Sequence, residues 1–250
     1  MATRVRPSRS STVVYLYGVT AKSVTGLTVV GVDGKASVEP MICAGLICWI
    51  SQVSQIEFAD NLAKNMENLD WLSEAGVRHQ RIVSAIAEVA DILPARFGTV
   101  FLDGSSLKED VRKRKKLLAA DLRKIHGCDE WGVKVFGVPQ QMRVPERKPD
   151  TGRGYLETKA ALLRRPSIGI AAEELESFSK ALHRISAETS DGGRISGGQR
   201  GLQWQSSILL KRGDRKKLEA LLQKYSQKWM DSGKIECTGP WPPYSFVSKQ

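Results

Sequence analysis

The three histidines are the residues of this chain best suited to acid–base catalysis or metal binding, and their surroundings favour neither. His79 lies on the apolar face of a predicted helix, where no second histidine or glutamate has the spacing of a helical metal site. We therefore expect a hydrogen-bonded core histidine. His126 comes directly before a glycine that should end a helix, where its side chain can satisfy terminal carbonyls. His183 lies beside Arg184 on a predicted helix and is expected to face solvent.

The cysteines and glycines also lack the spacing that metal or phosphate binding requires. Four cysteines are present, at Cys43, Cys48, Cys128 and Cys237. They form no Cys-x-x-Cys pair, so we expect reduced, buried thiols in a cytosolic protein rather than a zinc site. Residues 31–35 and 152–154 contain paired glycines without the spacing of a phosphate-binding loop. The sequence therefore predicts no catalytic residue, no metal, no cofactor and no enzyme activity.

Positive charge is the strongest chemical signal in the sequence. The chain has a net charge of +11 and an isoelectric point near 9.6. Residues 108–124 carry eight basic and three acidic residues, a net of +5, and residues 211–228 carry seven and two, again +5. An acidic protein surface, nucleic acid or an anionic membrane could each be attracted to such clusters. The candidates for partner binding in the first cluster are Arg112, Lys113, Lys115 and Lys116.

Nucleic acid and membranes fit these clusters less well than a protein does. Base stacking needs exposed aromatic side chains beside the cations, and residues 108–124 contain none. Tyr225 and Trp229 accompany the second cluster, but they belong to the apolar stripe of its predicted helix. The longest apolar run, residues 41–50, is far shorter than the roughly 20 residues of a membrane-spanning helix. We predict no nucleic acid and no membrane partner, and keep a basic nucleic-acid-binding protein as the alternative function.

The first half of the chain mixes strands with two long helices. Segments rich in β-branched and aromatic residues predict strands at residues 13–20, 27–32, 38–54, 97–102 and 131–137. Apolar residues at three- and four-residue steps predict a helix from Trp71 to Leu93, ended by Pro94. Ser105 or Ser106 should cap a second helix, which should end near Gly127. Its apolar stripe consists of Leu107, Val111, Leu118, Leu122 and Ile125.

The second half repeats this mixture after a proline-rich stretch. Residues 138–150 contain three prolines and no periodicity, which predicts a linker. Beyond it we expect helices at 154–163, 175–185 and 218–229, strands at 204–210 and 234–238, and a glycine-rich loop at 190–201. The predicted organisation is a basic disordered tail at 1–12, a domain at 13–137, the linker, and a domain at 151–250. Each domain fits an α+β fold in which helices pack on one side of an antiparallel sheet.

Five short blocks, taken in order, resemble the gas vesicle accessory proteins GvpF and GvpL. The blocks are residues 15–18 (YLYG), 93–101 (LPARFGTVF), 131–136 (WGVKVF), 152–156 (GRGYL) and 238–247 (TGPWPPYSFV). Each is weak alone, but their order extends over the chain after its basic tail. The resemblance implies two modified ferredoxin-like domains, which agrees with the division into domains above.

The resemblance also implies a non-catalytic role in building a gas-filled protein shell. Its implied partners are the hydrophobic major gas vesicle shell subunit and other gas vesicle accessory proteins. The implied location is the cytoplasm and the gas vesicle itself, on the gas-facing side of the shell. A shell subunit with a large apolar surface needs a shielding partner before assembly, because such patches aggregate.

Three residues within these blocks have both a structural and a partner-binding interpretation. Arg96 is expected to form a buried or half-buried ion pair that ties strand to helix, with direct contact to a partner as the alternative. Trp241 and Tyr244 lie in a proline-rich segment that either covers part of the protein or presents aromatic rings to a partner. We expect residues 234–247 to pack on the second domain, with at least Trp241 or Phe246 mostly buried.

Overall fold

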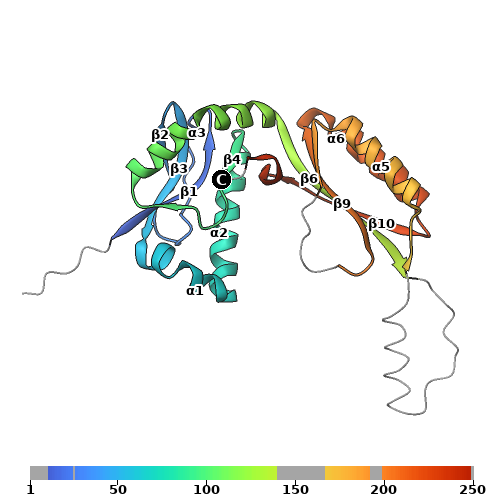
Figure 1. The fold of residues 1–250 in the computed structure, drawn as a ribbon, viewed down its shortest axis with the longest axis horizontal. Helices are drawn as coiled ribbons and strands as arrows, with labels where there is room; N and C mark the ends of the chain where they lie inside the picture. The colour runs from blue at the N-terminus through green and yellow to red at the C-terminus, as the bar shows by residue number, and fades with distance from the viewer. Residues whose placement is uncertain (1–10, 25, 140–166, 192–198, 249–250) are drawn as a thin grey trace, which may run out of the picture. The chain divides into compact units, whose positions relative to one another are not determined.

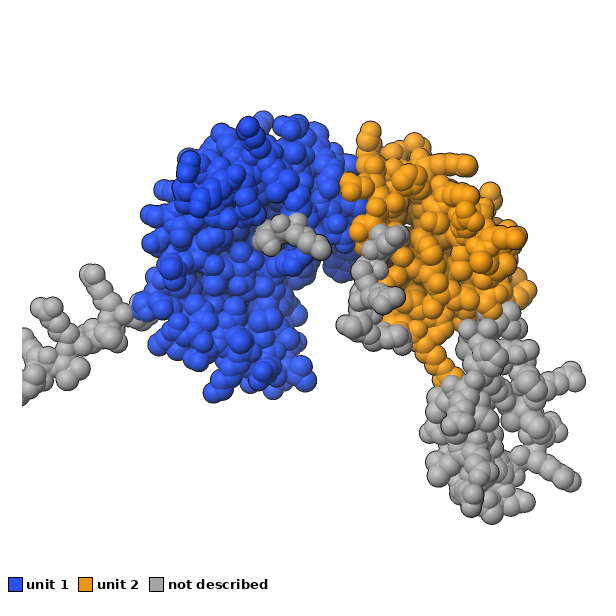
Figure 2. All heavy atoms as spheres, viewed as in Figure 1, with its two compact units in different colours: residues 1–129, 241–250 blue, residues 130–240 orange. Residues whose placement is uncertain are grey.

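The computed structural model describes residues 11–24, 26–139, 167–191 and 199–248 (Figure 1). Most of the basic tail, the linker from residue 140 onwards, the helix expected at 154–163 and most of the glycine-rich loop lie outside these residues. The chain forms two compact units, Met1–Asp129 with Trp241–Gln250, and Glu130–Pro240 (Figure 2). The division therefore falls within two strands, β6 (Cys128–Pro139) and β10 (Gly233–Trp241).

Unit 1 is built on an antiparallel sheet in the order β2-β3-β1-β4, with β5 also pairing with β1. Its strands are β1 (Thr12–Thr20), β2 (Glu39–Cys43), β3 (Leu46–Ser54), β4 (Ile92–Pro94) and β5 (Val100–Phe101). Its helical segments are η1 (Ile56–Asp60), α1 (Leu62–Glu67), α2 (Leu69–Ala87), α3 (Gly104–Ile125) and η3 (Tyr244–Phe246).

Helices cover both faces of the unit 1 sheet, not one face as expected. Tyr15 and Tyr17 of β1 belong to the core that contains the buried face of α2. Cys48 of β3 lies on the other face, close enough to Asp110 and Arg114 of α3 for their charges to affect its pKa. The cause is visible in β1, which is buried along all but its first residue because its apolar residues do not alternate with polar ones.

Helix α2 ends at Ala87, before the end that the periodicity predicted. Leu93 continues the helical spacing in sequence, but it pairs with Val19 in strand β4 and is 1% exposed. Pro94 is the last residue of this short strand rather than a helix terminator. Pairing with β1 thus decided the conformation of a segment whose apolar spacing also fits a helix.

Unit 2 has a sheet in the order β10-β6-β9-β8, with β7 also pairing with β6. Its further elements are β7 (Ser167–Ile168), α5 (Ala172–Ile185), β8 (Glu188–Asp191), β9 (Leu202–Lys211), η2 (Arg212–Asp214) and α6 (Arg215–Lys228). Here α5 and α6 share one core with the sheet, built around Phe178, Leu182, Leu218, Tyr225 and Trp229. The one-sided arrangement expected from the sequence therefore fits this unit.

The C-terminal segment after β10 is packed into unit 1, which corrects the expectation that it packs on the second domain. Phe246 is 2% exposed, as expected for one of the aromatic residues, whereas Trp241 is 45% exposed. The Tyr244 hydroxyl lies 3.3 Å from Nε2 of His79 on α2. Ser248 donates from its backbone N–H and its hydroxyl to Asp121 of α3, at 3.0 and 3.1 Å. The segment thus connects the two long helices of unit 1.

Candidate partner-binding groove beside helix α3

Helix α3 presents the first basic cluster because its sequence fixes both its start and its buried face. The Asp103 side chain accepts a hydrogen bond from the backbone N–H of Ser106. The Ser106 hydroxyl in turn accepts one from the backbone N–H of Asp103, and the two bonds form a capping box. The predicted apolar stripe is buried along its whole length. Gly127, at φ 68°, follows the helix as the expected C-terminal glycine. The cations between these ends are left on the outer surface.

Ion pairs along the helix engage part of this basic cluster. Glu109 forms ion pairs with Arg112 at 2.8 Å and with Lys113 at 3.6 Å. Arg114 forms an ion pair with Asp110. The hydrogen bond from Arg112 lowers the pKa of Glu109, because it stabilises the charged carboxylate. Lys115 and Lys116 are exposed and have no acidic partner among the described residues. The predicted cluster is therefore cationic and solvent-facing, with Lys115 and Lys116 as its free charges.

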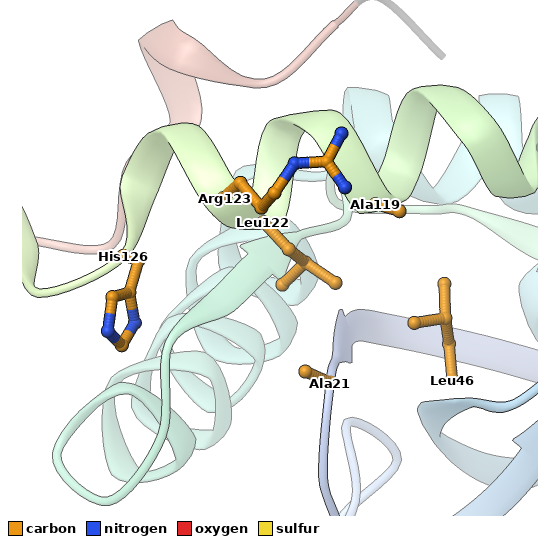
Figure 3. Close-up of a pocket in the computed structure, with 6 residues that line it drawn as sticks. All are labelled: Ala21, Leu46, Ala119, Leu122, Arg123 and His126. Carbon is orange, nitrogen blue, oxygen red and sulfur yellow. The ribbon is translucent and has the colours of Figure 1, made fainter.

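An apolar groove runs beside the second half of α3. Its volume is about 300 Å³, and it is lined by Ala21, Leu46, Ala119, Leu122, Arg123 and His126. Figure 3 shows Leu122 pointing towards Ala21 and Leu46, whereas the Arg123 guanidinium points away from them. The lining is thus apolar between helix and strands and cationic at the rim.

A second hollow of about 490 Å³ shares Ala21 and His126 with this groove. It extends past Lys22 to the turn after α2, where Asp91 and Val89 lie. The Asp91 carboxylate is 2.7 Å from Nδ1 of His126, so the acidic residue of this hollow already has a partner. The two hollows adjoin at Ala21 and His126 near the end of α3.

The residues that line the groove could not be predicted from the sequence, because they come from separate segments of the chain. Ala21 follows β1, Leu46 begins β3, and the remaining residues come from α3 and its end. The available signal was the pair Ala119-Ala120, which leaves little side-chain bulk beside the buried Leu118 and Leu122. Ala119 lines the groove and is half-buried, while Ala120 is exposed.

None of the seven predicted partner-binding residues lines this groove, although the four on α3 lie on the same helix as Ala119 and Leu122. Arg96 is exposed between β4 and β5, so the expected buried or half-buried ion pair is wrong. Its carbonyl instead accepts from the backbone N–H and hydroxyl of Thr99, which shapes the turn. Trp241 is exposed, and the half-buried Tyr244 is engaged with His79. Only the four α3 residues thus form one continuous candidate surface.

Two of the histidines fit the structural roles expected of them, whereas His126 pairs through Nδ1 with the Asp91 carboxylate at 2.7 Å instead of with terminal carbonyls. His79 is 3% exposed, with Nδ1 3.0 Å from the Tyr15 hydroxyl and Nε2 3.3 Å from that of Tyr244. Burial lowers the pKa of His79 to about 4, because an imidazolium there would lose its hydration. A neutral imidazole donates from one nitrogen and accepts at the other, which satisfies both contacts. His183 is exposed and lies 3.3 Å from the hydroxyl of Thr189.

The thiols are all free, as expected. Cys43, Cys48 and Cys128 are buried, and Cys237 is half-buried. Burial raises the pKa of the Cys48 thiol and raises that of Cys237 to about 11. Within the described ranges, no group of three or more His, Cys, Asp or Glu side chains is arranged to hold a metal ion. No helix in the part of the chain that the structure describes is long and apolar enough to cross a membrane.

Comparison with known proteins links this architecture to gas vesicles. The chain is 28% identical over 200 residues to gas vesicle protein L of a Streptomyces species, covering 74% of this chain and 73% of that protein. It is 22% identical over 244 residues to gas vesicle protein F1 of Halobacterium salinarum, covering 93% and 92%.

Two crystal structures of GvpF share the fold. The GvpF of an Anabaena species matches with a TM-score of 0.66 at 16% identity, covering 96% of this chain and 98% of that one. The GvpF of Microcystis aeruginosa matches with a TM-score of 0.66 at 17% identity, covering 95% and 99%. This likeness confirms the two-domain α+β architecture. The family described as gas vesicle synthesis protein GvpL/GvpF matches residues 13–248, and the chain therefore belongs to that family.

Proposed function

We propose that this protein is a non-catalytic accessory protein of gas vesicle assembly that binds the hydrophobic major shell subunit while the shell forms. Its membership of the GvpL/GvpF family supports the role in gas vesicles. The observation that supports binding is the open apolar groove beside α3, bordered by Arg123 and close to Lys115.

Such a groove suits a partner that must be kept from aggregating. A subunit with a large apolar surface is prone to self-association until that surface is covered. The groove offers the apolar side chains of Leu46, Ala119 and Leu122, and the cations at its rim favour one orientation of the bound segment. Binding of this kind needs no reacting group.

We propose other accessory proteins of the same assembly as further partners, without assigning a surface to them. We place the binding reaction in the cytoplasm during assembly, and the protein on the gas-facing side of the finished shell.

Co-purification with the major shell subunit tests the proposal. The full chain is expressed with the shell subunit of a gas vesicle gene cluster, and the retained subunit is quantified. Ala119→Trp fills the groove and should lower retention, whereas Ala120→Trp makes the same change on the solvent side of α3 and should not. Equal retention by both variants, or none by the wild-type chain, would contradict the proposal. Retention of nucleic acid instead, lost at raised salt, would favour the alternative function.

A further inference from the structure

We propose that the groove beside α3 receives an acidic amphipathic segment of the partner. Apolar side chains of that segment insert between Leu46 and Leu122, and its carboxylates contact Lys115 and Arg123. This inference rests on the proposed function, because it specifies the chemistry of the segment that the groove binds.

The size and lining of the groove favour a few apolar side chains over a small cofactor. Its volume of about 300 Å³ is at the lower end for ligand sites, which span roughly 300–1,000 Å³. Cofactor sites also need several convergent polar groups, and here only Arg123 and His126 are polar. Leu46 and Leu122 are each 8% exposed, so only a small part of each side chain faces the groove, which limits the occupant to a few apolar side chains.

The cations around the groove favour a bound segment that carries carboxylates. Arg123 borders the groove and directs its guanidinium outward (Figure 3). A Cβ placed on Gly45 would lie 3.9 Å from Nζ of Lys115, which brings this lysine next to the β2–β3 turn that precedes Leu46. Neither cation has an acidic partner among the described residues. Arg112, in contrast, is already bound by Glu109.

The second hollow extends the available length without adding an unpaired negative charge. It contains Lys22 and shares His126, whose Nδ1 lies 2.7 Å from Asp91. An elongated occupant, such as one face of a helix, can therefore continue from the groove into this hollow. Grooves of this shape commonly receive amphipathic helices through apolar anchors spaced along one face.

The lining argues against nucleic acid as the occupant. Neither hollow is lined by Phe, Tyr or Trp, on which bases would stack. The wall formed by Ala21, Leu46 and Leu122 would remain in contact with water if only phosphates were bound. An apolar segment that carries carboxylates uses both the wall and the rim.

Two synthetic peptides of equal length test this chemistry on the purified full chain. Each has leucines along one helical face, and the flanking positions are glutamate in one peptide and lysine in the other. Fluorescence anisotropy should show that the glutamate peptide binds about tenfold more tightly at low salt, since two surface ion pairs together contribute about that factor. Raised salt should reduce the difference.

Two matched double variants assign the preference to the groove. Lys115→Glu with Arg123→Glu should abolish the preference for the glutamate peptide. Lys216→Glu with Lys224→Glu changes the net charge equally on α6 and should keep it. Ala119→Trp should weaken both peptides. If the first variant fails to fold by circular dichroism, Lys115→Gln with Arg123→Gln replaces it.

The outcomes separate this inference from the proposed function. Equal binding of the two peptides, no binding of either, or an equal effect of the α3 and α6 variants would overturn the inference. If the wild-type chain still retains the major shell subunit in that case, the proposed function stands. If the wild-type chain keeps the peptide preference but does not retain the shell subunit, the groove still binds acidic amphipathic segments. The proposal that the shell subunit is the partner is then wrong.

Discussion

Helices α3 and α6 occupy regions of equal net charge but differ in what surrounds them. Three basic residues near α6 have separate acidic partners, in the pairs Arg215–Glu219, Lys217–Asp214 and Lys228–Glu174. On α3, three basic residues share two acids, and an apolar groove adjoins the second half of the helix. Charge density therefore does not locate a binding surface by itself. The combination of free cations with an apolar depression distinguishes α3.

The largest expected difference between the two units comes from the C-terminal segment. Phe246→Ala should destabilise unit 1 by about 3–5 kcal/mol, because it removes a fully buried aromatic side chain. Amide hydrogen exchange should show lost protection in α2 and α3 and unchanged protection in α5 and α6. Trp241→Ala is the control, since that ring is largely exposed and its loss should change little. Lost protection confined to unit 2 would contradict the packing described here.

The buried histidine should make unit 1 sensitive to acid. The pKa of His79 falls from 6.5 in the unfolded chain to about 4 in the folded one, so its stabilising effect is complete above pH 6.5. As the pH falls from 6.5 towards 4, only the unfolded chain binds the proton, and up to about 3 kcal/mol of stability is lost. Chemical denaturation of the wild type and of His79→Gln across this pH range measures how the free energy of unfolding changes with pH.

The matched control for this titration is His126→Gln, because that histidine is exposed. The His79 variant should be less stable at neutral pH, since Tyr15 and Tyr244 lose a well-placed partner, and its pH slope should be smaller. Equal slopes in the wild type and His79→Gln would show that other groups cause the acid sensitivity.

Charge reversal should separate the two basic helices in partner binding. Changing Lys113, Lys115 and Lys116 to Glu should weaken binding of the shell subunit about tenfold at low salt, since these exposed charges lie on the same helix as the groove. The same change at Lys211, Lys216 and Lys224 should have a smaller effect. Titration of both variants at two salt concentrations measures this. A similar loss of affinity in both variants would show that α3 acts only through the net charge of the protein.

The smallest expected difference concerns the ion pairs themselves. Glu174 accepts from the indole N–H of Trp229 at 2.6 Å and from Lys228 at 2.9 Å. Glu174→Ala leaves a buried indole without its acceptor, so it should lower the melting temperature of unit 2 measurably. Glu109→Ala releases only Arg112 and Lys113, which are exposed, and should leave the melting temperature nearly unchanged. A larger effect at Glu109 would reverse this ranking.

Features of the fold that depend on local sequence were predictable. The stripe of α3 from Leu107 to Ile125 follows directly from helical periodicity, and Gly127 ends the helix because it adopts a positive φ readily. The predicted N-cap was two or three residues off, because Asp103 rather than Ser105 or Ser106 caps the helix. Such residues interact with near neighbours in the chain, so a single sequence contains the needed information.

Features that depend on distant contacts were not predictable in the same way. The aromatic composition of residues 241–246 indicated burial, but nothing local told which unit would receive Phe246. The groove escaped prediction because Ala21 and Leu46 have no sequence relation to α3. Arg96 carries a charge that could pair in many ways, and its exposure follows from a turn closed by its own carbonyl.

The return of the C-terminal segment to unit 1 determines the order in which the protein can be completed during synthesis. Unit 2 is one continuous stretch, so all of its residues are made before residues 241–250. Unit 1 lacks Phe246 and the contact of Ser248 with Asp121 until these later residues are made. Domains usually fold in the order of their emergence from the ribosome. Here the N-terminal unit is completed only after the residues of unit 2, and a nascent chain that ends within unit 2 does not yet carry a fully anchored α3.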